Sequence, residues 1–168
     1  MAVSADVLRT HIDFTAWATL QLLDLAAQLP PEQLTHDFQT ADHSVLGTLV
    51  HIFAADRLWL ARLTGAPGTF ITDADRSLTA LQSGWPAVLD GWKRFAGSLS
   101  DEQARAEFAY HDLEGRAWKQ PLWQLMLHVV NHGTHHRGQV VGFLRTLGHT
   151  PPQIDLVRFY REQLAAQA

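Results

Sequence analysis

Apolar residues recur at three- and four-residue steps in four long stretches of the chain, a spacing that is typical of amphipathic helices. The stretches are residues 4–29, 45–63, 77–99 and 121–147. Between them the sequence is polar or rich in glycine and proline, and little of it has the alternation of a strand. This pattern predicts an all-α fold, most simply a four-helix bundle.

Residues that begin and end helices support these boundaries. Ser4 and Ser44 are suitable N-caps for the first and second helices, and Gly148 is a suitable residue to follow the fourth. Within the third stretch, Gly84 and Pro86 predict an interruption, as a kink or as a fresh helix start.

Two shorter elements flank the fourth helix. Residues 106–121, AEFAYHDLEGRAWKQP, alternate loosely around a turn-like centre and form either a small hairpin or a loop. After Pro151 and Pro152, Asp155 is expected to cap a short final helix to about Ala165. The length of 168 residues favours one domain, residues 1–168.

Composition narrows the classes of function. The net charge of −4 disfavours nucleic acid or an anionic membrane as the main partner. The chain has no cysteine, so it has no disulfide and no thiol nucleophile, and a metal site would need histidine or carboxylate ligands. No apolar run approaches the ~20 residues of a membrane span. The N-terminus lacks the pattern of a signal peptide, so we expect a cytoplasmic location.

The stretch HVVNHGTHHRGQV, residues 128–140, contains four histidines in the fourth helix. Residues four apart stack on one helix face, so His128, His132 and His136 form a ladder. His135 points about 100° away from His136. Two histidines four apart can offer two ring nitrogens to one ion. Spacing alone leaves open whether the pair is His128 with His132 or His132 with His136, or whether the rings are ordinary hydrogen-bonded side chains.

Two histidines need a third ligand, because a catalytic zinc ion usually has three protein ligands and one open position. His51 lies in the middle of the second helix, where a lone histidine is more often a hydrogen-bonded core residue. Bundles, however, build metal sites from facing helices, so His51 could complete the set. His43, just before that helix, is expected near the mouth of such a site.

Two passages of the chain resemble the DinB family of four-helix bundles, which have a three-histidine metal centre. Residues 44–63, SVLGTLVHIFAADRLWLARL, are similar to the family's second helix with its single histidine. Residues 125–160, LMLHVVNHGTHHRGQVVGFLRTLGHTPPQIDLVRFY, are similar to its NHxxxHRGQ helix, Leu-Gly turn, Pro-Pro segment and closing helix. The resemblance covers nearly the whole chain, and NHxxxHRGQ is its most specific part.

Carried over by position, the family's ligands fall on His51, His132 and His136, which selects one of the two pairs that spacing left open. His128 then lines the pocket or supports the ligands. The resemblance implies a divalent metal ion, with zinc or nickel favoured and iron also suited to imidazole. It further implies a frequent homodimer, a link with stress, and relatives that transfer small thiols such as mycothiol, bacillithiol or glutathione.

Three functional hypotheses follow, and none assigns a catalytic residue. The first is a metal-dependent S-transferase, in which a small thiol attacks a second small-molecule substrate held near the tryptophans. The second is metal-assisted hydrolysis, which is disfavoured because residues 121–148 contain no Asp or Glu to act as a base, and Asp56 lies off the His51 face. The third is a non-enzymatic, stress-related metal-binding bundle, which a fourth ligand such as His128 would favour.

Two further pairs of residues carry expectations. Arg57 and Arg137 are candidates for binding a substrate carboxylate, although a salt bridge or a dimer contact suits Arg137 better. Gly138 and Gly142 form a small-xxx-small pair that would let another helix approach closely. A homodimer formed through helices is expected, with its interface not placed by the sequence.

Overall fold

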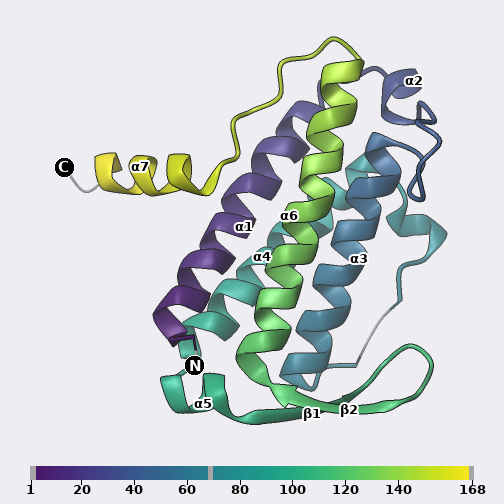
Figure 1. Cartoon of the computed structure of the whole chain (residues 1–168). Coiled ribbons are helices and arrows are strands. Elements are labelled where there is room, and N and C mark those ends of the chain that lie inside the picture. Colours follow the sequence, from purple (N-terminus) through teal and green to yellow (C-terminus); the bar gives the residue numbers. More distant parts are fainter. Residues whose placement is uncertain (1–2, 68–69, 167–168) are drawn as a thin grey trace.

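The computed structural model describes residues 3–67 and 70–166, in which four long helices run side by side and a hairpin crosses one end (Figure 1). In chain order the elements are α1 (Ala5–Ala26), α2 (Pro31–Leu34), α3 (Val45–Thr64), η1 (Asp73–Asp75), α4 (Leu78–Ser98), α5 (Asp101–Arg105), β1 (Glu107–His111), β2 (Ala117–Pro121), α6 (Leu122–Thr146) and α7 (Leu156–Ala166). The prediction of an all-α bundle with a short final helix is confirmed.

The four long helices, α1, α3, α4 and α6, enclose the core. α3 packs along α6, and α1 packs on both α4 and α6. Leu22, Leu49, Trp85 and Leu144, one from each helix, are fully buried there. Burial of such a side chain contributes about 1.5–3 kcal/mol, so packing of the apolar faces, more than intrinsic helix propensity, stabilises these helices.

Serine caps and glycines define helix boundaries that the sequence suggested. The Oγ atoms of Ser4 and Ser44 accept hydrogen bonds from the first turns of α1 and α3. Gly65 and Gly148 follow α3 and α6 with φ angles of 68° and 85°, a left-handed conformation that glycine adopts without strain. The two serines therefore begin their helices, and the two glycines end theirs.

Of the two alternatives predicted at Gly84 and Pro86, a fresh helix start is wrong, because α4 is one helix from Leu78 to Ser98 with Pro86 inside it. Proline removes one hydrogen bond from a helix. The flanking indoles of Trp85 and Trp92 are buried, and they donate to the carboxylate and the carbonyl of Asp56 at 2.9 and 3.0 Å. These contacts fix both halves of α4 against α3.

Residues 106–121 form the hairpin, which resolves the choice between hairpin and loop. β1 and β2 pair antiparallel, with Tyr110 opposite Trp118. The pair lies beneath one end of α3 and α6, shown at the bottom of Figure 1. The hairpin therefore closes the end of the bundle where the polypeptide enters α6.

α7 projects away from the bundle (Figure 1). The carbonyl of Asp155 accepts hydrogen bonds from the N–H groups of its first turn. Phe159 is its one buried residue within the described chain, and its ring lies 5.9 Å from that of Phe14 and 5.6 Å from that of Trp17. An aromatic cluster on α1 thus anchors α7. No helix in the described ranges is both long and apolar enough to cross a membrane.

Candidate metal centre

Three histidines from two helices meet between α3 and α6. His51 comes from the middle of α3, and His132 and His136 lie one turn apart on α6. The Nε2 atoms of His51 and His132 are 2.9 Å apart, and the ring of His136 is 4.4 Å from that of His51. One nitrogen from each ring lies within 4.8 Å of the other two. The structure thus brings together the three residues that the family resemblance selects.

The chemistry of this donor set fits a divalent cation. At about 2.0–2.1 Å from a tetrahedral ion, two ring nitrogens would be roughly 3.3 Å apart, close to the spacing of His51 and His132. Two neutral Nε2 atoms at 2.9 Å must share a proton or a cation, because their lone pairs otherwise repel. His132 Nδ1 is buried and has no hydrogen-bond partner among the described residues, so it is not tied to a competing contact.

Asp42, in the loop before α3, faces the outer nitrogens of two of the histidines. Its carboxylate oxygens lie 3.5 Å from Nδ1 of His51 and 3.6 Å from Nδ1 of His136. A carboxylate in this place favours the tautomer that carries the proton on Nδ1. Both Nε2 atoms are then left as lone-pair donors, the form that a metal requires.

Gly47 allows the Asp42 loop to pack against the first turn of α3. A Cβ atom at this position would lie 2.0 Å from the carbonyl oxygen of Asp42. The loop is held further by a hydrogen bond of 2.7 Å from the N–H of Phe38 to the carbonyl of His43, whose φ angle is 60°. Only a glycine at position 47 permits this close approach, so that residue places the carboxylate.

Gln139 fixes the ring of His136 from within α6. Its Oε1 atom lies 2.7 Å from Nδ1 of His136, and an amide oxygen can only accept a hydrogen bond. Gln139 and Asp42 therefore act on the same nitrogen, and both orient His136 with Nε2 free. The final residue of the HRGQ stretch acquires a physical role from this contact.

The environment of His132 keeps it unprotonated. Burial lowers the pKa of His132 to about 4, with further lowering by the neighbouring His136 and His51. Burial also lowers the pKa of His136, whereas Gln139 raises it. Neutral imidazole is the form that coordinates metal, so the site is prepared for a cation at neutral pH.

The sequence comparisons point to one family. A model described as the DinB family matches residues 1–167. The chain belongs to the DinB family. It is also similar to the protein named DinB from Bacillus subtilis (strain 168), with 24% identity over 153 residues, which cover 85% of this chain and 87% of that protein.

The remaining histidines of this DinB-family chain lie outside the three-histidine group. The ring of His128 is 6.0 Å from that of His132 and packs against Trp59 of α3 at 5.5 Å. His135 is exposed on the next face of α6. His43, expected near the mouth of the site, is exposed, and its Nδ1 atom lies 3.4 Å from Asp37.

The expectations for Arg137 are wrong. Its guanidinium is buried, donates to the hydroxyls of Thr19 and Thr134 at 3.3 and 3.0 Å, and lies 5.7 Å from the ring of Phe14. Gly133, one turn earlier, leaves the room that it occupies, since a Cβ there would be 2.7 Å from Nη1. Burial lowers the pKa of Arg137 to about 10. Within the described residues it has no ion pair, and it points away from the histidines.

Two other expectations also change. Arg57 does not face a substrate, because it forms two hydrogen bonds, of 3.1 and 3.3 Å, with the carboxylate of Asp75 and so holds the segment before α4. Gly138 and Gly142 are exposed, and nothing in the described chain lies within 4 Å of a Cβ at either position. Neither glycine accommodates another helix of this chain.

A pocket of about 530 Å³ adjoins His51 on the side facing the hairpin. One face of α3 forms one wall, the tip of the hairpin forms another, and Phe70 and Ile71 complete it. This volume lies in the range of small-molecule sites. The pocket places a ligand next to the histidines without passing through the core.

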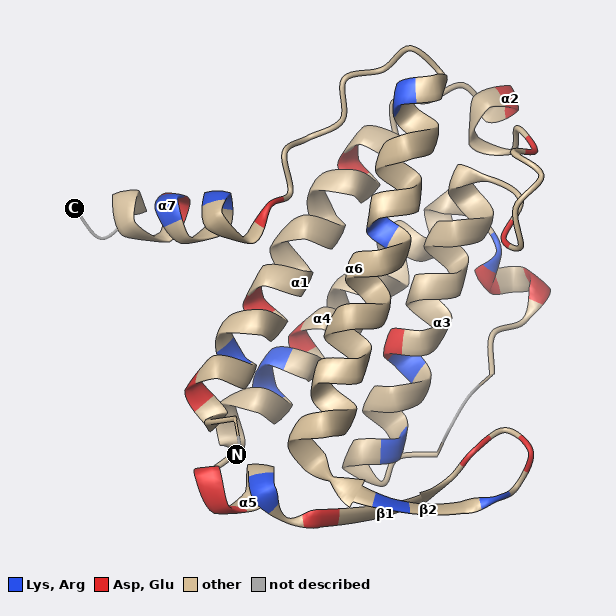
Figure 2. Cartoon of the chain, in the orientation of Figure 1, with Lys and Arg blue, Asp and Glu red and all other residues tan. Residues whose placement is uncertain are grey.

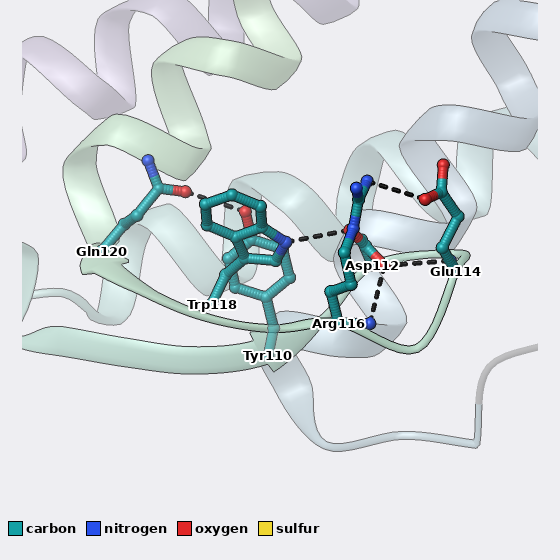
Figure 3. Close-up of polar contacts among 6 residues, drawn as sticks. All are labelled: Tyr110, Asp112, Glu114, Arg116, Trp118 and Gln120. Carbon is teal, nitrogen blue, oxygen red and sulfur yellow. Dashed lines mark hydrogen bonds and ion pairs between the residues drawn. The ribbon is translucent and has the colours of Figure 1, made fainter.

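Asp112 organises the hairpin tip above this pocket (Figure 3). Its carboxylate accepts hydrogen bonds from the indole of Trp118 at 2.9 Å and from Nε of Arg116 at 2.8 Å. It also accepts from the backbone N–H groups of Glu114 and Arg116. These bonds hold the pKa of Asp112 well below its usual range, with the Trp118 contact the largest cause. The alternation of strand and turn residues in the hairpin was visible in the sequence, but the position of the hairpin beside His51 was not.

Proposed function

We propose that His51, His132 and His136 bind one divalent metal ion. The observation that carries this proposal is the convergence of three histidine ring nitrogens, with Asp42 facing the Nδ1 atoms of two of the rings. Imidazole ligands suit zinc and nickel, and iron as well. Three protein ligands leave a coordination position for a small molecule, which favours a reactive site over a structural one.

We propose further that the protein is a metal-dependent enzyme, of the type that transfers a small thiol to an electrophile. A divalent ion bound to the histidines would act as a Lewis acid and lower the pKa of a thiol coordinated to it. The chain has no cysteine, so the sulfur would come from a low-molecular-weight thiol. The pocket beside His51 would hold the electrophile while the carbon–sulfur bond forms and the leaving group departs with its electron pair.

The two alternative functions have less support. Hydrolysis needs a base near the attacking water. Figure 2 shows no acidic residue on α6, so this helix does not supply a carboxylate base. Asp42 is close, but it faces the Nδ1 atoms of the ligands, where it orients them. A closed structural site would need a fourth ligand, and His128 lies outside the group. The homodimer, the stress-related role and the cytoplasmic location stay predictions.

The first experiment is the metal content of tag-free protein, measured by elemental mass spectrometry. We expect near-stoichiometric metal in the wild type, and its loss in His51→Ala, His132→Ala and His136→Ala. His128→Ala and His135→Ala are matched controls from the same helix and should retain the metal. Absence of metal from the wild type, even after addition of zinc or nickel, would refute the proposal.

The second experiment tests the transfer reaction. Metal-loaded protein is mixed with glutathione, bacillithiol or mycothiol and the fluorogenic electrophile monochlorobimane. We expect thiol-dependent conjugation above the uncatalysed rate, and its loss in His132→Ala. Conjugation at the same rate in His132→Ala would show that the histidines are not responsible.

A further inference from the structure

The pocket beside the histidines continues along α3 as a trough. His51, Ala55, Leu58 and Arg62 all line it, and their spacings of four, three and four residues place them on one helix face. Its two ends, His51 and Arg62, are eleven positions apart, a rise of about 16 Å at 1.5 Å per residue. The small side chains of Ala54 and Ala55 leave space directly beside His51.

The middle of the trough is apolar. Leu58 and Trp59 lie along α3, while Tyr110 and Leu113 face them from the hairpin. The rings of Trp59 and Tyr110 are 5.2 Å apart in an edge-to-face arrangement, so the aromatic wall is preformed. Leu113 is 72% exposed, so its apolar surface is available to a ligand. An apolar ligand body of extended shape would cover it.

Two arginines line this pocket, and they differ in their ion pairs. Arg116 is matched by Asp112 and Glu114, at 2.8 and 2.9 Å. Arg62 has no ion-pair partner in the described chain, and its guanidinium lies 4.9 Å from the ring centroid of Trp59. Stacking of this kind holds the position of the guanidinium while its N–H groups remain available.

We propose that this trough binds an elongated amphiphilic carboxylate, with the carboxylate on Arg62 and the apolar body along Leu58 and Trp59 toward His51. Arg62 is thus a specificity-determining residue. The inference rests on the proposed function in one respect, since the end of the ligand near His51 would carry the reacting group. Binding of the carboxylate itself needs no metal.

The test is isothermal titration of n-octanoate into wild-type protein and Arg62→Gln. A hydrogen-bonded charge pair of this kind makes a contribution that corresponds to about a tenfold loss of affinity when it is removed. We expect that loss in Arg62→Gln, partial recovery in Arg62→Lys, and unchanged affinity in Arg161→Gln, which alters an exposed arginine of α7. Octanamide, which lacks the charge, should bind wild type and Arg62→Gln equally.

Two variants separate this inference from the metal proposal and place the ligand in the trough. His132→Ala removes a proposed metal ligand, and Arg62 should still govern octanoate affinity in that background. Ala55→Leu fills the trough and should weaken octanoate and octanamide alike. Octanoate affinity that is absent in the wild type, or unaffected by Arg62→Gln or Ala55→Leu, would overturn the inference, as would octylamine binding as tightly as octanoate. Metal content bears on the proposed function alone.

Discussion

Asp42 supports the orientation of two histidines, because its carboxylate faces Nδ1 of both His51 and His136. We predict that Asp42→Asn weakens metal affinity about 10- to 100-fold, the usual effect of removing a carboxylate that supports metal ligands. Competition with a chromophoric chelator at neutral pH measures this change.

Asp37→Asn is a matched control for the Asp42 variant, since Asp37 lies in the same loop but pairs with His43. Its metal affinity should equal that of the wild type. Gly47→Ala should reproduce the weakening without changing any charge, because a methyl group there displaces the loop. Equal affinity in Asp42→Asn and wild type would mean that the carboxylate does not orient the ligands.

Single residues also mark the limit of prediction from sequence. The spacing of His132 and His136 follows from helix geometry, but nothing in the sequence pairs Asp42 with a histidine nine residues later. That contact depends on a loop whose path is set by the close approach at Gly47. Arg57 and Arg137 were candidates for binding a substrate because of their charge. In the structure, however, their guanidinium groups donate hydrogen bonds to Asp75 and Thr19. Tertiary contacts alone single out Arg62.

At the scale of elements, Asp56 joins α3 to α4 through the two indole hydrogen bonds. Burial raises the pKa of Asp56 to about 6, although the contact with Trp85 and the charge of Arg137 lower it. Its folded pKa is above its unfolded value near 3.8, so the stability that it contributes at low pH is lost as pH rises through 6.

We therefore predict that Asp56→Asn, which keeps an oxygen to accept from Trp85, gains stability relative to the wild type between pH 4.5 and 7. The limit over this range is roughly 2 kcal/mol, because about 1.5 pH units separate pH 4.5 from the folded pKa of about 6, at 1.36 kcal/mol each. Urea unfolding of metal-free protein at the two pH values measures the difference. Asp24→Asn, at an exposed site of α1, should show no such trend. A constant difference across this range would contradict the shifted pKa.

The hairpin offers a second prediction at this scale. Asp112→Ala removes the acceptor of four hydrogen bonds at the tip, so residues 107–121 should lose amide protection while the four long helices keep theirs. Hydrogen exchange measured by mass spectrometry resolves the two regions. Glu114→Ala removes one ion pair of the tip and should have a smaller effect. Unchanged protection of the hairpin would show that Asp112 does not hold it.

The long helices were predictable from their apolar pattern, and the two shortest α-helices were not. The four long helices each carry enough turns for an apolar pattern to be recognised, and their serine caps confirmed the starts. α2 and α5 contain four and five residues, too few for a period to repeat. α4 passed through Pro86 because its tryptophans are fixed by α3, a contact that local sequence does not encode.

At the scale of the whole molecule, α7 carries an apolar stripe that no described part of the chain covers. Val157, Tyr160 and Leu164 are 55%, 41% and 68% exposed, and their spacing places them on one side of the helix. Phe159 meanwhile anchors α7 to α1. The expected homodimer would bury this stripe against a second copy.

We predict that the wild type is a dimer by size-exclusion chromatography with light scattering, and that Leu164→Glu shifts it toward monomer by placing a charge in an apolar contact. Arg161→Glu changes the charge of the same helix without altering the stripe, and should remain dimeric. A monomeric wild type, or a Leu164→Glu variant that stays fully dimeric, would place the association elsewhere or exclude it.

The separation of His51 from His132 along the chain has one more consequence. These residues are 81 positions apart, and they lie in different helices. An ion held by both would close a large loop of a polypeptide that has no disulfide, and because only the folded chain brings the two histidines together, its binding would stabilise the folded state. Thermal resistance would then rise with the free metal concentration. The same closure fixes α3 against α6, so metal supply would determine both how long the protein survives and how rigidly its trough is held.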